Sequence, residues 1–292
     1  MNYRSLLSLL LIPLLCTCGR APENDAPEAK TDEVVRPADY VVPPATGYDA
    51  PKSYPGKTLV WADEFNGNTL DTSAWNHDLG SKYNGWGNNE LEYYGPENTS
   101  VVDGNLVITA REERREGFDY TSSRITTKGK QEFKFGRLDL RAALPSGQGI
   151  WPALWMLGTG HGSGTPWPDC GEIDIMEFLG HQTDSIYGTL HFKTPDGHGY
   201  APGKTSAAAG QDYLGDFHVY SVDWSPGRIE WFLDGQSFHT VERADTNAEP
   251  WPFDEKFYFL INLAVGGNWP GNPDESTTFP QHFYVDYVRV YQ

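Results

Sequence analysis

The chain has 292 residues, 38% of them hydrophobic and 14% aromatic, which is enough for a sizeable core in one large domain or two small ones. Its formal net charge of −18 argues against nucleic acid and anionic membrane surfaces as partners, because both attract basic patches. The same charge favours a neutral ligand over a sulfated one.

The N-terminal residues have the pattern of an export signal. Arg4 precedes an apolar run over 6–15, which is too short to cross a membrane as a helix. The run ends at Cys16 and Cys18, and the residues before Cys18 resemble a bacterial lipobox. We therefore expect a signal peptide over 1–18 and a lipid anchor at Cys18, on the outer membrane or cell surface of a bacterium. Ordinary cleavage and secretion is the alternative.

Two further segments follow the signal. Residues 19–56 are rich in Pro, Ala and acidic residues without an apolar period, which predicts a disordered tether. Residues 57–292 contain short runs of β-forming residues between Gly, Asn, Asp and Pro clusters, which predicts one all-β domain, a β-sandwich of antiparallel strands. Strands are expected at 58–65, 105–112, 137–144, 218–225, 257–265 and 283–291, with a hairpin at 228–242 that turns at Asp234-Gly235. Cys170 is expected to be a buried free thiol.

Three acids lie within a run that otherwise has the composition of a buried strand. The segment "DCGEIDIMEF" (169–178) places Glu172, Asp174 and Glu177 among isoleucine and methionine. In a regular strand Glu172 and Asp174 share one face and Glu177 points to the other. One extra residue, a β-bulge near Ile175-Met176, returns Glu177 to the face of the other two. We therefore predict a bulged strand that presents three carboxyl groups together.

Three carboxyl groups on one face suggest glycoside hydrolysis. A retaining glycosidase needs an ionised carboxylate as nucleophile and a protonated carboxylic acid beside the same glycosidic bond. Repulsion between neighbouring carboxylates raises the pKa of one of them, which keeps an acid protonated near neutral pH. The alternatives for these residues are a solvated strand face and a cluster that binds a divalent metal.

The run "GEIDIMEF" resembles the bulged E-x-D-x-x-E signature of glycoside hydrolase family 16, in its laminarinase-like branch, and departs from the E-x-D-x-E of the bulge-free relatives. The resemblance implies a jelly-roll sandwich whose concave cleft holds a β-glucan chain and cuts it internally with retention. It continues in order along nearly the whole domain, in "WADEFNG" (61–67), "GWGNNELEYY" (85–94), "SSRI" (122–125), "GIWPALWML" (149–157), "GTLHF" (188–192), "NLAVGGNWPG" (262–271) and "YVDYVRVY" (284–291).

The resemblance also implies a role for each acid, with Glu172 as nucleophile, Asp174 as assisting carboxylate and Glu177 as general acid/base. Strand alternation places Trp151 and Trp155 on one face, where indole planes can stack on sugar rings; burial in the core is the alternative. The other candidates for substrate binding are two tryptophans on predicted loops and three residues that resemble sugar-binding or site positions of the family: Trp86, Trp269, Asn89, Arg124 and His191.

The resemblance further implies a structural Ca²⁺ between the N- and C-terminal strands, held by Glu64, the backbone carbonyl of Gly104, and Asp286, because oxygen ligands of this kind suit calcium. No cofactor is expected for catalysis, and we expect a monomer. The leading hypothesis is an endo-β-1,3-glucanase for laminarin-type glucan. The first alternative is the same mechanism on mixed-linked β-1,3-1,4-glucan or an agar-type galactan, and the second is a non-catalytic β-glucan-binding protein on the same fold.

Overall fold

The computed structural model describes Met1 and residues 36–82 and 84–292. The predicted signal peptide, the lipid-anchor cysteine and the first part of the predicted tether therefore lie outside the described residues. Among the residues that are described, no helix is long and apolar enough to span a membrane.

Almost all regular structure in the described residues is β-strand, as predicted. Irregular or short helical turns occur at Gly85–Asn89, Pro96–Asn98, Arg243–Asp245 and Pro252–Asp254. The strands are β1 (Leu59–Asp63), β2 (Asn76–Asp78), β3 (Glu92–Tyr94), β4 (Thr99–Val102), β5 (Asn105–Arg115), β6 (Phe118–Ser122), β7 (Arg124–Thr126), β8 (Gly136–Ala143), β9 (Ile150–Gly158), β10 (Glu172–Phe178), β11 (Ser185–Thr194), β12 (Gly197–Ser206), β13 (His218–Ser225), β14 (Arg228–Leu233), β15 (Gln236–Glu242), β16 (Phe257–Val265) and β17 (Gln281–Tyr291).

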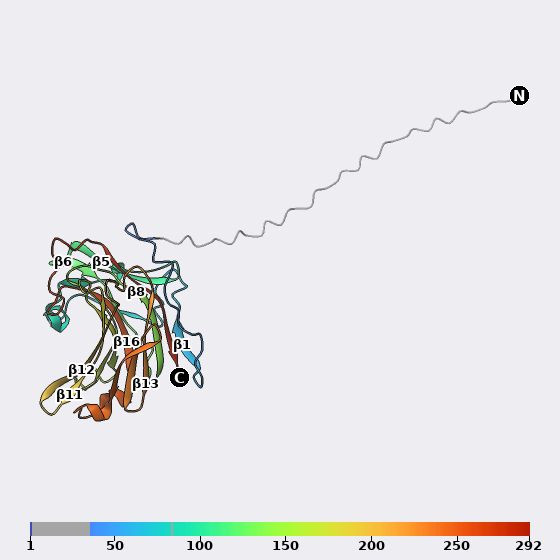
Figure 1. The fold of residues 1–292 in the computed structure, drawn as a ribbon. Helices are drawn as coiled ribbons and strands as arrows, with labels where there is room; N and C mark the ends of the chain where they lie inside the picture. Colours follow the sequence, from blue (N-terminus) through green and yellow to red (C-terminus); the bar gives the residue numbers. More distant parts are fainter. Residues whose placement is uncertain (2–35, 83) are drawn as a thin grey trace. The chain divides into compact units, whose positions relative to one another are not determined.

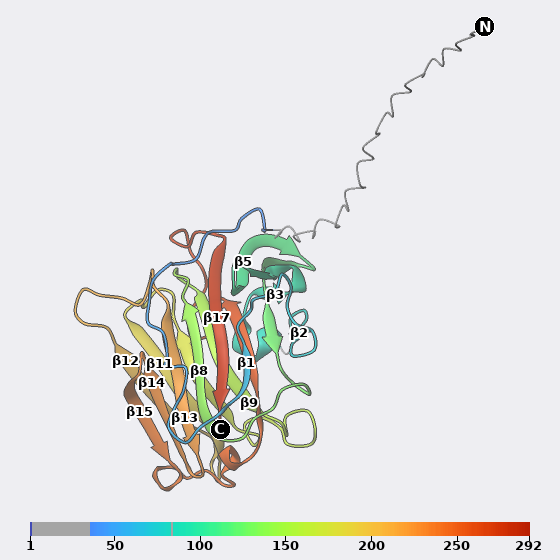
Figure 2. The same cartoon turned by 90° about the vertical axis from the view of Figure 1, so that its right-hand side faces the viewer.

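The strands form two sheets that pack face to face, and both sheets curve (Figure 1). The outer sheet has the order β15-β14-β13-β8-β17-β5-β6-β3, with β1 added on β17 and β4 on β5. Figure 2 looks onto this sheet, in which β17 runs between β8 and β1. The inner sheet has the order β12-β11-β10-β9-β16-β7-β2. Strand β10 therefore lies within the inner sheet, with two strands on one side and four on the other.

The core between the sheets is built by alternation along each strand. In β10, the side chains of Ile173, Ile175, Met176 and Phe178 are almost fully buried in one cluster with residues of both sheets. The predicted hairpin is present as β14 and β15, and Asp234 (φ 50°) and Gly235 (φ 76°) both have the positive φ that a type I′ turn requires. Because one face of each sheet is committed to this core, the inner sheet offers its other face to the site.

The tether prediction is wrong for residues 36–56, which we call the N-terminal strap. These residues pack along the outer sheet within the same compact unit as the strands. Near its start, Asp39 accepts a hydrogen bond from Arg111 Nε at 2.6 Å. Near its end, the Tyr54 hydroxyl donates to Asp139 at 2.6 Å. Further contacts between the strap and the sheet join Arg36 to Asp103, Val41 to Tyr284, Tyr48 to Phe217 and Arg141, and Asp49 and Ala50 to Tyr287.

Candidate active site

Strand β10 carries the predicted bulge. Its register with β11 shifts between Asp174 and Glu177, and its register with β9 shifts between Asp174 and Met176. Ile175 and Met176 both point into the core, so two consecutive residues occupy the place of one. As a result Glu172, Asp174 and Glu177 all line the cavity on the inner sheet.

Burial raises the pKa of all three carboxyl groups. Desolvation and the neighbouring Asp174 raise the pKa of Glu172 to about 8, while His191, Arg124 and a hydrogen bond from Trp167 favour its charged form. Desolvation raises the pKa of Asp174 well above its usual value. The pKa of Glu177 is also well above its usual value, through desolvation and the charge of Asp174. Of the three, Glu172 has the most partners that support an ionised carboxylate.

A histidine pair from the β11–β12 hairpin stands beside these acids. His191 Nε2 lies 3.3 Å from Asp174 Oδ2 and 3.8 Å from Glu172 Oε1. Its other ring nitrogen, Nδ1, is 2.9 Å from Nε2 of His198, so one of the two rings donates to the other. The indole N–H of Trp167 donates to Glu172 Oε2 at 3.1 Å. These contacts orient the acids from one side of the cavity.

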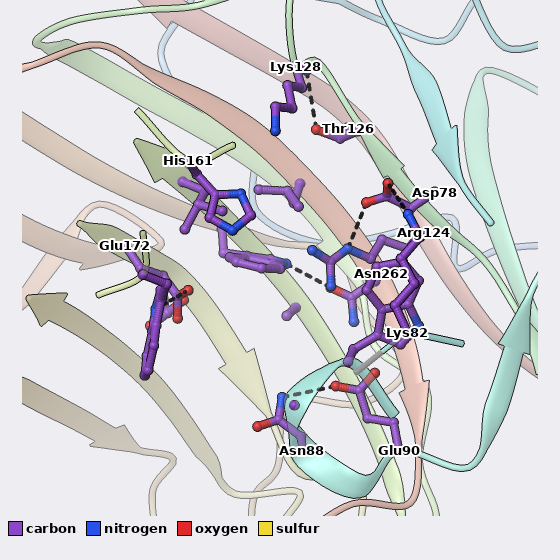
Figure 3. A pocket seen from close by; sticks show the side chains of 18 of the residues that line it. Asp78, Lys82, Asn88, Glu90, Arg124, Thr126, Lys128, His161, Glu172 and Asn262 are labelled. Carbon is purple, nitrogen blue, oxygen red and sulfur yellow. Dashed lines mark hydrogen bonds and ion pairs between the residues drawn. The ribbon is translucent and has the colours of Figure 1, made fainter. Parts of the chain in front are cut away.

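The wall on the other side is built from stacked rings around one cation. The guanidinium of Arg124 lies 4.6 Å from the ring centre of Trp86 and 4.8 Å from that of Trp155. Arg124 Nε also pairs with Asp78 Oδ2 at 3.1 Å (Figure 3). The Trp155 indole N–H donates to Asn262 Oδ1 at 2.7 Å. The edge contact fixes Trp155, and the cation holds both indole rings, so the wall presents aromatic surface on which the C–H face of a sugar ring can stack.

The cavity between these walls, which we call the cleft, has a volume of about 600 Å³. Of the predicted substrate-binding residues, Trp86, Arg124, Trp151 and Trp155 line it together with the three acids. Trp269 is 43% exposed and packs edge-on against Trp151 at 5.6 Å, so it lies at the rim.

Asn89 lies elsewhere than predicted. It is exposed and donates a hydrogen bond to Asn268, and the neighbouring Asn88 lines the cleft instead. Positive φ values at Gly85, Trp86, Gly87 and Asn89 make this segment an irregular turn, whose side-chain directions strand alternation could not predict.

Several lining residues were not predicted from the sequence. Asp78, Glu90, Lys128, His161, Trp167, Tyr258 and Asn262 all border the cleft. Trp167 had a detectable signal, since it stands in a Gly/Pro-rich segment just before the acids. Tyr258 and Asn262 are an even number of residues apart in β16, so strand alternation places them on the same face. Because β16 is otherwise hydrophobic, the sequence did not indicate which of its faces borders the cleft. Cys170 is a buried free thiol, as predicted.

The predicted calcium ligands do not fit an ion in this structure. Both carboxylate oxygens of Glu64 accept hydrogen bonds from Arg289, at 2.7 and 2.8 Å. Asp286 Oδ2 accepts one from Arg141 at 2.7 Å. Within the described residues, Glu64 and Asp286 do not gather with further acidic or histidine ligands into a cation site. Arginine therefore supplies the positive charge that the prediction assigned to calcium.

Comparisons with known proteins agree with this geometry. The sequence model of glycosyl hydrolases family 16 matches residues 87–289. A β-glucanase of Rhodothermus marinus is 42% identical over 257 residues, covering 84% of this chain and 89% of the relative. A glucan endo-1,3-β-glucosidase of Cryptopygus antarcticus is 41% identical, covering 79% of this chain and 90% of the relative. The solved catalytic domain of an endo-1,3-β-glucanase (laminarinase) from Thermotoga petrophila is 47% identical, with a TM-score of 0.76 over 81% of this chain and 98% of that one.

Proposed function

Because this chain belongs to glycosyl hydrolases family 16, we propose that it is a retaining endo-β-1,3-glucanase acting on laminarin-type glucan. The observation that carries the proposal is the bulge of β10, which brings three buried acids to the floor of a tryptophan-walled cleft. The relatives with similar sequence and fold are named for hydrolysis of β-glucan and 1,3-β-glucan.

The proposed reaction is a double displacement. Glu177 donates a proton to the glycosidic oxygen while the Glu172 carboxylate attacks the anomeric carbon, so the bond to the leaving chain breaks and a glycosyl-enzyme ester forms. Glu177, now ionised, then takes a proton from a water molecule that attacks the same carbon and releases Glu172. Two inversions give overall retention.

The raised pKa values suit this division of roles. Burial raises the pKa of Glu177 well above its usual value, which favours the protonated form and suits the acid of the first step. Burial also raises the pKa of the almost fully buried Asp174, which favours its neutral form. The pKa of Glu172 is about 8, so we expect kcat/KM to rise as Glu172 ionises and to fall as Glu177 loses its proton.

Cleavage inside the chain follows from binding surface on both sides of β10. On one side lie Trp151 and Trp155 of β9. On the other side the Trp167 ring lies 4.6 Å from His198 and the ring of Tyr200 lies 6.0 Å from His198, with Tyr200 62% exposed. Because aromatic faces flank the acids in both directions, a polysaccharide can be held on either side of the bond that breaks.

The test is release of reducing sugar by the protein from laminarin, mixed-linked β-1,3-1,4-glucan and agarose in parallel. A Glu172→Gln variant should lose activity on laminarin, whereas Glu275→Gln, at an exposed acid, serves as the matched control. Proton NMR at early times should show the β-anomer of the new reducing end. Cleavage of laminarin with first formation of the α-anomer would refute retention.

The same three polysaccharides also distinguish the alternative functions. Activity confined to mixed-linked glucan or agarose would keep the mechanism and change the substrate. Binding of laminarin without cleavage of any polysaccharide would favour a glucan-binding protein. That second alternative gives no reason for three neighbouring acids with raised pKa values on β10, a pattern that is typical of catalytic sites.

Export and anchoring are proposed from the sequence alone. The signal over 1–18 and the lipobox-like residues before Cys18 support transfer across the inner membrane and attachment of lipid at Cys18. Radioactive palmitate supplied to expressing cells should label the wild-type protein and not a Cys18→Ala variant. Equal labelling of both would refute Cys18 as the modified residue.

A further inference from the structure

A second pair of carboxyl groups lies behind the cleft wall, away from β10. Glu92 of β3 has no exposed surface. Its Oε2 accepts a hydrogen bond from the backbone N–H of Val265 at 2.7 Å. Its Oε1 receives no N–H or O–H from any described residue. Glu90, two residues earlier in the chain, lines the cleft, and its charge is among the causes that raise the pKa of Glu92.

Two carboxyl groups can share a hydrogen bond only if one of them carries a proton, because an ionised carboxylate has no donor. The titratable and charged groups near the pair are the Tyr94 hydroxyl, which donates to Glu90, and Arg124 of β7, whose charge lowers the pKa of Tyr94. Arg124 is paired with Asp78, and no lysine, arginine or histidine of the described residues forms an ion pair with Glu92. Burial and the charge of Glu90 therefore raise the pKa of Glu92 well above its usual value.

We propose that Glu92 is a positioning residue, which stays a neutral acid and donates a hydrogen bond to the Glu90 carboxylate, thereby fixing the glucan-binding wall of the cleft. The proposal deepens the proposed function and rests on it, since the wall is expected to contact sugar. Glu92 itself does not line the cleft and acts only through Glu90.

A continuous chain of hydrogen bonds joins Glu90, the proposed partner of Glu92, to the wall. Glu90 Oε1 accepts from Asn88 Nδ2 at 3.0 Å (Figure 3). Glu90 Oε2 accepts from the Tyr94 hydroxyl, also at 3.0 Å. Asn262 Nδ2 donates to the Tyr94 oxygen at 3.3 Å, and Asn262 Oδ1 accepts from Trp155. Every donor in this chain points toward Glu90, whose two oxygens both accept, so Glu92 is the member of the pair that is left to carry a proton.

Two substitutions of similar size separate this role from simple packing. In Glu92→Gln the amide oxygen can still accept from Val265 and the amide nitrogen can donate to Glu90, so the neutral isostere should rescue the wall and keep KM and kcat for laminarin within about twofold. Glu92→Leu removes both hydrogen bonds and should raise KM about tenfold with a smaller change in kcat. A Gln variant as impaired as the Leu variant, or a Leu variant with wild-type KM, would overturn the proposal.

A second measurement needs no activity and remains available if the Leu variant does not fold. The unfolded chain ionises Glu92 above about pH 4.3, whereas the folded protein holds it protonated to a much higher pH. The wild type therefore loses stability as pH rises through that window, and Glu92→Gln does not. We expect the excess of the variant's Tm over the wild-type Tm to grow steadily from pH 4 to pH 8.

The outcomes of the two measurements are distinguishable. A Tm difference that does not change with pH would overturn the neutral Glu92, whatever the kinetics show. A wild type that cleaves no laminarin would overturn the proposed function, and the Tm series would still decide the protonation of Glu92.

Discussion

Acidic side chains on the two sheets can have opposite surroundings. Along the outer sheet three acids each pair with an arginine: Asp139 with Arg137, Asp286 with Arg141 and Glu64 with Arg289. On β10 of the inner sheet, Glu172, Asp174 and Glu177 have no arginine or lysine within ion-pairing distance among the described residues, and Glu172 and Asp174 lie beside His191 instead.

The difference shows what each arrangement is suited to do. A buried carboxylate that is paired with arginine stays charged and contributes a fixed contact between strands. A buried carboxyl group without such a partner has a raised pKa and exchanges protons near neutral pH, which is what acid–base catalysis requires. Pairing with arginine therefore distinguishes these three acids of the outer sheet from the acids of β10, to which we assign the reaction.

The largest expected effect is on catalysis and concerns the acids of β10. Glu177→Ala should lower kcat on laminarin by about 10²–10⁴-fold, because the leaving oxygen loses its proton donor. The decline of activity at high pH, which we assign to loss of the Glu177 proton, should disappear in the variant. Added azide should restore turnover of an activated aryl glycoside, since a charged nucleophile needs no general base. An unchanged alkaline limb would mean that another group is the acid.

The next prediction concerns the stability that arginine-paired acids of the outer sheet contribute. Arg137→Met should destabilise the protein by about 3–5 kcal/mol, because it leaves the fully buried Asp139 with only Tyr54 as a donor from a side chain. Arg228→Met breaks a more exposed pair with Glu230 and should change stability by less than about 1 kcal/mol. Urea unfolding of both variants measures the two losses of stability, and equal losses would contradict the prediction.

The N-terminal strap should make a smaller contribution to the stability of the protein. Removal of residues 1–56 should lower stability by about 2–4 kcal/mol relative to removal of residues 1–35, since it deletes the hydrogen bonds that Arg111 donates to Asp39 and that Tyr54 donates to Asp139. The kcat at a temperature where both fragments are folded should be the same, because the cleft lies on the other sheet. Identical Tm values would show that the strap contributes nothing.

The smallest expected effect is that of a chelator. Arg289 occupies both oxygens of Glu64, so EDTA should change Tm by less than about 2 °C. A fall of more than about 5 °C that added Ca²⁺ reverses would show that a calcium ion contributes to the outer sheet after all. Glu64→Gln, which weakens the pair with Arg289, is the matched comparison for the size of that contact.

The sequence predicted those features whose signal is local. The bulge of β10 followed from the odd spacing of Glu172, Asp174 and Glu177, and the β14–β15 turn followed from Asp234-Gly235, because alternation and turn geometry act over a few residues. Trp151 and Trp155 were placed by the same rule.

The features that were missed depend on distant partners. Arg289 lies 225 positions from Glu64, so no local pattern could show that an arginine would pair with this predicted calcium ligand. The strap lacks periodicity because its residues contact several different strands one by one. Glu90 and Asn262 meet through Tyr94 only after β3 and β16 have come together. These contacts form only when remote segments pair in the folded protein, and the composition of each segment does not predict that pairing.

The sequence did not predict strand β12, and the composition of this strand affects pairing between molecules of the protein. It is the last strand of the inner sheet and pairs with β11 over its whole length, although it contains three glycines and Pro202. Sheet edges invite pairing with strands of other molecules, and proline and glycine weaken such pairing by removing a donor and by lowering β-propensity. The glycines and the proline of β12 therefore weaken the pairing of this sheet edge with strands of other molecules and lower the tendency of the protein to aggregate.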